Sequence, residues 1–425
     1  MEYSKFTKTE LEEMLKQEQK NLAKIGKKGI SVDMSRGRPA VEQFDAVMPM
    51  LEDAGAYNYA LASGDARNYG GLGGIRQARE LFGELLGLRA ENIIVGDGSS
   101  LDFMYTAVQF AMQFGLRGET PWGKLNKVKF ICPAPGYDRH FAICEEFGIE
   151  MITVPLNEDG PDMDTVESLV VDDESIKGIW CVPKYSNPTG IIYSDKVVER
   201  LATMKTAAKD FRVFWDNSYA IHGLYENNDK LKNIFDVARK AGTFDRVLTF
   251  ASTSKITFAG SGIACMGASE ENVVEYLKHL SIREICPNKV NQVMHVSFLK
   301  NVDNIKKIMA EHAKVLRPKF ELVESRLTAE FADDEYVKWT NPRGGYFISL
   351  DVRHCARRII ELAKTVGIVF TPAGSAFPYH IDDGDSNIRI APSVPTIEEL
   401  SVALDVLVSA IKIARIELVL SKLFK

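Results

Sequence analysis

The feature of this sequence that most restricts its fold is a regular alternation of apolar runs with helical stretches. Between Ile93 and Met266 the runs IIVG, VKFIC, GIWCV, RVFW, RVLTFA and GIACMG are separated by segments of helical periodicity. Continuous apolar runs joined by helices are typical of a mostly parallel sheet that lies between helix layers. We therefore predict an α/β fold.

Loops of small and polar residues follow several of these runs, among them PAPGYD, PKYSNPTG, DNSY and STSK. In open α/β sheets, ligands bind beyond the carboxyl ends of the strands. We therefore expect the loops to converge on one crevice. The glycine-rich GGLGG at residues 70–74 lacks the preceding strand of a dinucleotide-binding fingerprint, which argues against a Rossmann dehydrogenase.

The length of the chain predicts more than one domain. Its 425 residues exceed the roughly 250–300 at which a single core stops growing. After about residue 300, a long helical segment and a short strand at NIRIAPS indicate a smaller α+β domain. We expect residues 48–300 to form the large α/β domain and residues 1–47 plus 301–425 to form the small one. The first helix is expected to begin with a capping box of Thr9 and Glu12.

Composition and charge argue against several classes of protein. A net charge of −6 and a pI near 5.8 give no electrostatic reason to bind nucleic acid or an anionic membrane. The late apolar stretch from Ser401 to Phe424 carries charges such as Asp405 and Arg415, which disfavour a membrane span. The cysteines form no C-x-x-C pair and the histidines lack metal-ligand spacing, so we expect no disulfide, no metal and a cytoplasmic location.

Lys255 stands in FASTSKITFAG, where an apolar strand ends in a polar turn. A lysine there suits a Schiff base with an aldehyde cofactor, which requires some neutral amine. A solvated loop lysine is the commoner alternative, but the neighbours favour the cofactor. Ser252 and Ser254 place hydroxyl groups beside it, while Ser99 and Ser100 open a helix whose free N–H groups suit a phosphate. Helix capping alone is the alternative for that second pair.

Four further side chains sit where a planar cofactor would need them. Asp216 ends the run RVFWD, and a buried carboxylate needs a partner such as a pyridinium nitrogen, although a helix N-cap explains it equally well. Tyr219 and Asn187 are placed to hydrogen-bond the oxygen on such a ring, and Tyr137 is placed to stack on it. Packed tyrosines and a generic N-P-T-G turn are the alternatives.

Arg389, in SNIRIAPS, is an isolated arginine between apolar residues. A buried guanidinium demands an anion, and its fork matches a carboxylate bidentately. A substrate α-carboxylate satisfies it, and so does an internal ion pair, which the residues alone slightly favour. His140 and His222 lie close in sequence to these candidates, but we expect ordinary packing for both.

The candidate residues, taken together, resemble a known family. Their order along the chain resembles the active-site series of fold type I aminotransferases of class I/II: Tyr69, the turn from Gly98 to Ser100, Tyr137, Asn187, Asp216, Tyr219, Lys255 and Arg389. The motifs SRGRPA, VGDGSSLDFMY, PKYSNPTG and STSKITFAGSGIA look like aspartate aminotransferases of the subgroup related to MocR-type aminotransferase domains. The likeness runs from about Ser35 to Ser393.

The resemblance implies a pyridoxal 5'-phosphate cofactor joined to Lys255, which also moves the proton between the substrate Cα and the cofactor C4′. It implies that Asp216 pairs with the pyridine nitrogen, and that Tyr219 and Asn187 hold the 3-oxygen of a ring on which Tyr137 stacks. It further implies a homodimer. The resemblance implies that the phosphate is bound by Ser99, Ser100, Ser252, Ser254 and a neighbouring subunit's Tyr69. It implies that Gly37 and Arg389 lie beside the substrate α-carboxylate.

One departure from the family concerns the phosphate. Many relatives place an arginine eight residues after the lysine, where this chain has Ile263. Either the hydroxyls and the helix dipole suffice, or a cation such as Lys184 or Arg36 takes its place. A dicarboxylic substrate also needs a second cation, for which Arg36 and Arg38 are the candidates; surface arginines in a proline-containing turn are the alternative.

These features predict a ping-pong aminotransferase that uses aspartate and 2-oxoglutarate. Alternatives are another donor such as alanine, an aromatic amino acid or kynurenine, and another reaction on the same cofactor such as C–S bond cleavage. A non-catalytic sensor domain, as in MocR-type regulators, is the alternative from another class. It is disfavoured because the roughly 35 residues before SRGRPA leave no room for a winged DNA-binding module.

Overall fold

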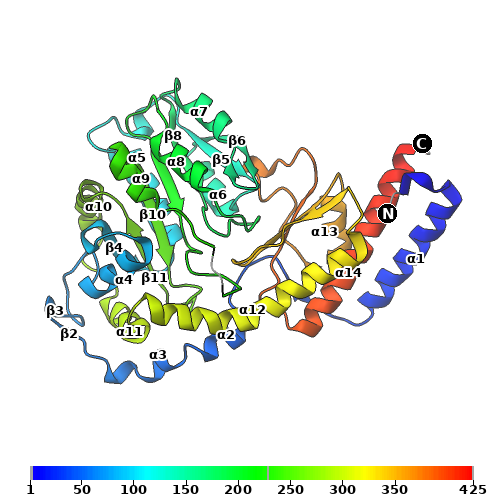
Figure 1. The fold of residues 1–425 in the computed structure, drawn as a ribbon, viewed down its shortest axis with the longest axis horizontal. Coiled ribbons are helices and arrows are strands. Elements are labelled where there is room, and N and C mark those ends of the chain that lie inside the picture. The colour runs from blue at the N-terminus through cyan, green and yellow to red at the C-terminus, as the bar shows by residue number, and fades with distance from the viewer. Residues whose placement is uncertain (1–2, 227–228, 424–425) are drawn as a thin grey trace.

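An eight-stranded sheet forms the centre of the larger part of the protein. The computed structural model describes residues 3–226 and 229–423 (Figure 1). Across the sheet the strands are β4 (Ile93–Asp97), β11 (Ile263–Gly267), β10 (Val247–Ser252), β9 (Arg212–Asp216), β8 (Ile176–Cys181), β5 (Lys129–Ala134), β6 (Glu150–Asn157) and β7 (Gly160–Pro161). Strand β11 is antiparallel to both neighbours and β7 to β6, whereas the remaining pairs are parallel. The predicted α/β fold is confirmed.

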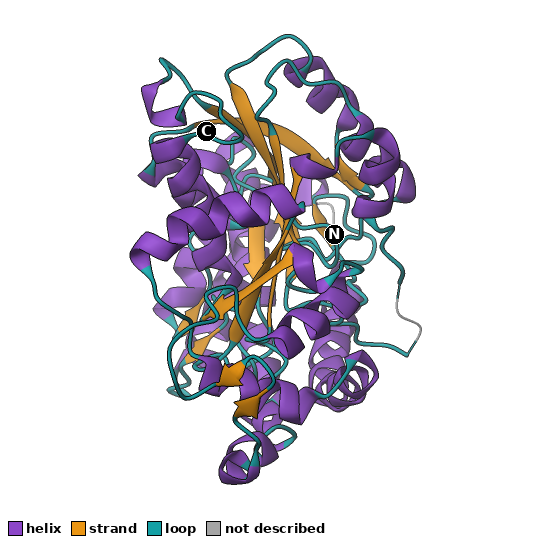
Figure 2. Cartoon of the chain, turned by 90° about the vertical axis from the view of Figure 1, so that its left-hand side faces the viewer, coloured by secondary structure: helices purple, strands orange, loops and turns teal. Residues whose placement is uncertain are grey.

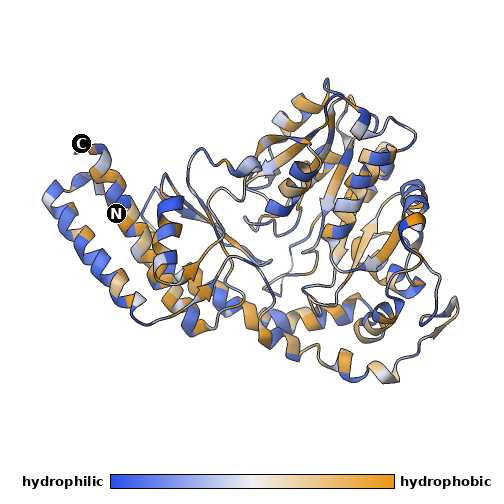
Figure 3. Cartoon of the chain, turned by 180° about the vertical axis from the view of Figure 1, so that it is seen from behind, coloured by the Kyte–Doolittle hydropathy of each residue, from blue (hydrophilic) through white to orange (hydrophobic). Residues whose placement is uncertain are grey.

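Both faces of this sheet are buried at its centre, because β9, β10 and β11 are mostly apolar and nearly all of their residues are buried. Along β10, Val247 and Ala251 belong to one apolar cluster, while Leu248 and Phe250 belong to another. Successive strand residues point to opposite faces, so each strand contributes to two cores. Figure 2 shows the strands lying between helices. Figure 3 shows that the strands are largely apolar and that the surrounding helices carry polar residues. These helices are α4 (Arg76–Leu86), α5 (Ser100–Phe114), α6 (Asp138–Glu146), α7 (Met163–Val170), α8 (Asp195–Thr203), α9 (Ile234–Ala241), α10 (Glu270–Arg283) and α11 (Lys289–Leu299).

A smaller layer of helices and strands follows. Strands β12 (Val337–Trp339), β13 (Ile348–Val352) and β15 (Asn387–Ile390) form an antiparallel sheet. It packs with α12 (Val302–Phe331), α13 (Ala356–Thr365) and α14 (Ile397–Leu423). Short elements complete the chain: α2 (Val41–Asp45), α3 (Pro49–Glu52), and a hairpin of β2 (Ala60–Leu61) and β3 (Gly64–Asp65).

The N-terminal segment packs against this smaller layer. Helix α1 (Lys8–Gly26) lies alongside α14, and β1 (Val32–Asp33) pairs in parallel with β14 (Ile368–Val369) (Figure 1). Helix α12 contacts both parts, because Ile305 near its start packs with Leu81 whereas Val323 lies in the core of the smaller layer. The limits of the two domains, at residues 47 and 300, stay a prediction.

The start of α1 differs from the sequence expectation. The capping box is made by Thr7 and Glu10, with the Glu10 carboxylate accepting a hydrogen bond from the Thr7 backbone N–H at 2.8 Å. The predicted box of Thr9 and Glu12 is wrong, because the sequence holds two overlapping T-x-x-E patterns and the helix begins at the earlier one.

Within the described ranges, no helix is long and apolar enough to cross a membrane, and no cluster of three or more His, Cys, Asp or Glu side chains is placed to hold a metal.

Candidate active site

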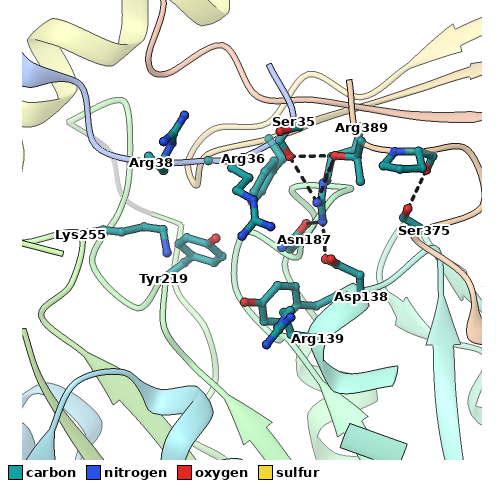
Figure 4. Close-up of a pocket in the computed structure, with 15 residues that line it drawn as sticks. Ser35, Arg36, Arg38, Asp138, Arg139, Asn187, Tyr219, Lys255, Ser375 and Arg389 are labelled. Atoms are coloured by element: carbon teal, nitrogen blue, oxygen red, sulfur yellow. Dashed lines mark hydrogen bonds and ion pairs between the residues drawn. The ribbon is translucent and has the colours of Figure 1, made fainter. Parts of the chain in front are cut away.

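A cavity of about 340 Å³ lies between the carboxyl edge of the large sheet and the smaller layer (Figure 4). The loops after β5, β8, β9 and β10 line it from one side with Tyr137, Asp138, Arg139, Asn187, Tyr219 and Lys255. The smaller layer and the segment around β1 line it from the other side with Ser35, Arg36, Gly37, Arg38, Phe347, Thr371, Pro372, Ser375 and Arg389. Residues far apart in sequence thus meet at one site.

Lys255 extends into this cavity from the turn that follows β10. Its amine lies 5.3 Å from the ring centre of Tyr219 and 5.7 Å from that of Tyr346. Desolvation lowers the pKa of Lys255, and the negative charge of Asp216 only partly opposes this effect. Near neutral pH, more of this amine is therefore uncharged than in an exposed lysine. Burial raises the pKa of Tyr219 well above its usual value, so its phenol stays a hydrogen-bond donor.

Asp216 is a buried carboxylate with a defined set of partners. One of its oxygens accepts hydrogen bonds from the Ser218 backbone N–H at 3.2 Å and from the Ser218 hydroxyl at 2.5 Å. Its other oxygen lies 3.1 Å from Nε2 of His140, whose ring stacks on Trp180 with 4.4 Å between centres. A turn rather than a helix follows Asp216, so the N-cap interpretation is wrong.

The two histidines behave differently. The prediction of ordinary packing for His140 is wrong, because this ring is buried against the Asp216 carboxylate and fixes its orientation. His222 is buried edge-on against Tyr219, with ring centres 5.6 Å apart. Burial, and to a smaller extent the charge of Lys255, hold the pKa of His222 well below its usual value, so this ring is neutral.

The serines expected at a phosphate come from two neighbouring turns. Ser99 occupies the N-cap position of α5, but its side chain makes no capping hydrogen bond, unlike Ser194, which caps α8. The N-terminal N–H groups of α5 are therefore not taken up by this hydroxyl. The alternative interpretation, in which the Ser99 side chain caps the helix, is therefore wrong.

Contacts across the sheet edge connect these turns to one another and to Asp216. The Gly98 N–H donates to the Gly262 carbonyl at 3.2 Å, and a Cβ added at Gly262 would meet the Ser254 hydroxyl oxygen at 2.9 Å. The Ser100 hydroxyl lies 3.1 Å from that of Ser218, which binds Asp216. Ser252 is the last residue of β10, directly before the Lys255 turn. None of the four serines lines the cavity itself.

Arg389 projects from β15 toward the cavity and is 7% exposed. Its guanidinium donates to the Asp138 carboxylate at 2.7 Å and to the Asn187 side-chain oxygen at 3.4 Å. It also donates to the Thr371 hydroxyl and to the Ser35 carbonyl. The internal ion pair considered from the sequence is thus present, and Arg389 lies at the side of the cavity that holds Asn187.

Comparison with known proteins decides the family. The sequence profile of the aspartate amino-transferase family matches residues 6–422. The chain belongs to this family. Its members depend on pyridoxal phosphate, as the resemblance predicted. The subgroup related to MocR-type domains stays a prediction.

Individual relatives support the same family assignment. An aspartate aminotransferase of Corynebacterium glutamicum is 45% identical over 393 residues, covering 92% of this chain and 91% of the relative. The crystal structure of an aspartate transaminase from the same organism superposes with a TM-score of 0.94 at 42% identity over 99% of each chain. LysN, an α-aminoadipate aminotransferase from Thermus thermophilus, shares the fold with a TM-score of 0.73 at 21% identity, covering 90% of this chain and 92% of LysN.

Ile263 replaces the family's phosphate arginine, and two residues considered for the phosphate, Lys184 and Tyr69, lie outside the Lys255 cavity of this aminotransferase. Ile263 is buried in β11, paired with Asp97, and brings no charge. The Lys184 amine donates to the Ala220 carbonyl at 2.9 Å and lines a different cavity. Tyr69 is 79% exposed and also lines a separate cavity, so within its own chain it does not reach the Lys255 site.

Sequence reasoning missed several residues of the aminotransferase site. Asp138 and His140 stand in the YDRH segment, where the first turn of α6 directs one side chain to Arg389 and the other to Asp216. Arg139 also lines the cavity. An acidic residue at a helix start usually serves the helix dipole, so the pattern alone gave no signal of these partners.

Gly37 occupies a position where no side chain fits. A Cβ built there would lie 2.6 Å from the Phe347 ring and 2.8 Å from the Tyr346 Cβ, and the Phe347 ring stacks 5.0 Å from the Arg389 guanidinium. We expect Gly37→Ala to displace Phe347, raise KM for the amino acid about 10-fold and cost about 1–3 kcal/mol of stability. Steady-state kinetics and thermal unfolding measure both. Gly55→Ala is the control, because a Cβ there meets nothing within 4 Å; equal effects of the two substitutions would contradict the prediction.

Proposed function

We propose that this aminotransferase transfers the amino group of L-aspartate to 2-oxoglutarate in a ping-pong reaction. The observation that carries the proposal is the placement of two arginines, Arg389 and Arg36, on the one cavity that also holds Lys255. A dicarboxylic amino acid needs a cation for each of its carboxylates and an amine acceptor between them. The 45% identity to an aspartate aminotransferase of Corynebacterium glutamicum supports the same choice of donor.

The residues around Lys255 fit pyridoxal phosphate. When bound, this cofactor supplies a protonated aromatic ring that withdraws electrons from the substrate Cα. In the proposal, Asp216 keeps the ring nitrogen protonated, and the hydrogen bonds from His140 and Ser218 hold this carboxylate in place. The buried, low-pKa amine of Lys255 would anchor the cofactor and would then move a proton between the substrate Cα and the cofactor C4′.

Other residues of the site orient the same group. Tyr137 stands at the start of α6 and, in the proposal, stacks on the ring, while Tyr219 and Asn187 bind its 3-oxygen. Burial and the nearby charge of Asp216 raise the pKa of Tyr137, which keeps its phenol neutral. The free N–H groups of α5, with Ser99, Ser100, Ser252 and Ser254, are proposed to bind the phosphate.

The second carboxylate of aspartate is assigned to Arg36. Of the described arginines that line the cavity, Arg36 and Arg139 have no ion-pair partner, whereas Arg38 pairs with Asp33 at 3.1 Å. In Figure 4 the Arg36 guanidinium points into the space between Tyr219 and Asn187. An unpaired guanidinium that faces the substrate space is suited to a carboxylate.

A substitution at Arg36 tests the proposed donor. We expect Arg36→Gln to lower kcat/KM for L-aspartate about 10- to 100-fold, because a charge-assisted hydrogen bond contributes about 1.5–3 kcal/mol. The value for L-alanine should change less than threefold, since alanine has no second carboxylate. Arg38→Gln is the matched control, and it should leave the preference for aspartate intact because Arg38 is held by Asp33. A wild-type enzyme that prefers alanine or kynurenine to aspartate would refute the proposal.

We also infer a homodimer and a cytoplasmic location. Tyr69, which the family resemblance directs to a neighbouring subunit, is 79% exposed beside the hairpin of β2 and β3, so it is available to a second copy. All six cysteines are free thiols, and this supports a reducing compartment.

A further inference from the structure

Every N–H group of the Arg389 guanidinium already has an acceptor within the protein. An arginine carries five N–H groups. Its Nε donates to the Thr371 hydroxyl at 3.3 Å, and its Nη1 donates to Asp138 at 2.7 Å and to Asn187 at 3.4 Å. Its Nη2 donates to the Ser35 carbonyl at 3.4 Å and to Thr371 at 3.2 Å. A carboxylate that binds bidentately takes two parallel N–H groups, so it must replace some of these acceptors.

Among the four acceptors, Asp138 is the one that a substrate carboxylate resembles. It alone is charged, and its contact with Arg389 is the shortest of the five. It uses a single oxygen, and its side chain is 27% exposed against 7% for Arg389, so it can turn toward water when released. As the first residue of α6 it also keeps a favourable interaction with the helix dipole after release.

We propose that Asp138 occupies the substrate-carboxylate position of Arg389 in the resting enzyme and is displaced when substrate binds. This inference rests on the proposed function, in which Arg389 receives the α-carboxylate. Asp138 lies on α6 of the larger part and Arg389 on β15 of the smaller layer, so displacement also releases an ion pair that spans the cavity. The competing carboxylate weakens ground-state and transition-state binding alike, so it raises KM while leaving kcat unchanged.

The isosteric substitution Asp138→Asn tests the competition, because it keeps the shape and removes the charge. With the cofactor-loaded enzyme, we expect the Kd of the unreactive dicarboxylate succinate to fall about 5- to 30-fold by titration calorimetry. KM for L-aspartate should fall by a similar factor and kcat should stay within about twofold. Unchanged or weaker succinate binding would overturn the inference. If Asp138 merely positioned Arg389, its replacement would not strengthen the binding of succinate.

Two further variants separate this inference from the proposed function. Asp195→Asn is the matched control, because Asp195 is also the first residue of a helix and also faces a cation, Lys232, but lies outside the cavity. Its succinate affinity should equal that of the wild type. Arg389→Lys should weaken succinate binding at least 10-fold. Wild-type affinity in Arg389→Lys would refute the substrate site itself, whereas weakening there without tightening in Asp138→Asn would refute only the displacement.

Discussion

Replacing Lys255 with alanine is expected to abolish transamination, with a loss of rate of about 10⁴-fold or more. The amine at this position is proposed both to anchor the cofactor and to carry the proton, and general acid–base catalysis alone contributes about 10²–10⁴-fold. The visible absorbance of the lysine-bound cofactor should disappear as well. Reduction of the wild-type protein with borohydride, followed by peptide mass spectrometry, should place the cofactor on the peptide that contains Lys255.

A second buried lysine provides the control for this substitution. Burial also lowers the pKa of Lys184, but its amine donates to the Ala220 carbonyl in a different cavity. Lys184→Met should therefore keep the yellow colour and most of the activity. Full activity in Lys255→Ala, or cofactor attached to Lys184, would contradict the assignment of the anchor.

Replacing Asp216 with alanine is expected to lower kcat by about 10²- to 10⁴-fold while some cofactor stays bound. Removing one member of a buried charge pair costs about 3–5 kcal/mol, and here the lost partner is the carboxylate proposed to keep the cofactor ring protonated. His140 and Ser218 would keep their places but lose their common acceptor. Single-turnover kinetics per bound cofactor separates this loss of rate from a loss of occupancy.

Asp210 allows a matched comparison with Asp216. It is also a buried carboxylate, and it lies just before the other end of β9, where it accepts hydrogen bonds from Lys177 at 2.7 Å and from Trp122 at 2.7 Å. Asp210→Asn should lower stability but leave the rate per bound cofactor near that of the wild type. Equal rates in Asp216→Ala and the wild type would show that this carboxylate has no part in the chemistry.

The sequence predicted the residues whose signal is local. Asp216 ends an apolar strand and Lys255 lies in the turn directly after another, and the carboxyl ends of parallel strands meet at one edge of a sheet. The α/β class followed in the same way from uninterrupted apolar runs, because β9 and β10 are buried on both faces.

The pairing of side chains was not predictable from the sequence. The ion pair of Asp138 with Arg389 joins residues separated by 251 positions, and the contact of His140 with Asp216 joins residues separated by 76. Neither pair has a fixed spacing, since the distance along the chain depends on the intervening helices. The proposed preference for Arg36 over Arg38 likewise rests on the position of Asp33, which forms an ion pair with Arg38.

The first half-reaction alone tests most directly whether the enzyme transfers the amino group of L-aspartate. The cofactor-loaded protein is mixed with L-aspartate in the absence of any 2-oxo acid, and oxaloacetate is measured together with the absorbance of the cofactor. We expect about one oxaloacetate per subunit, conversion of the cofactor to its pyridoxamine form, and recovery of the original spectrum with release of glutamate after 2-oxoglutarate is added. A protein that produces no oxaloacetate and whose spectrum does not respond to aspartate would show that aspartate is not its amino donor.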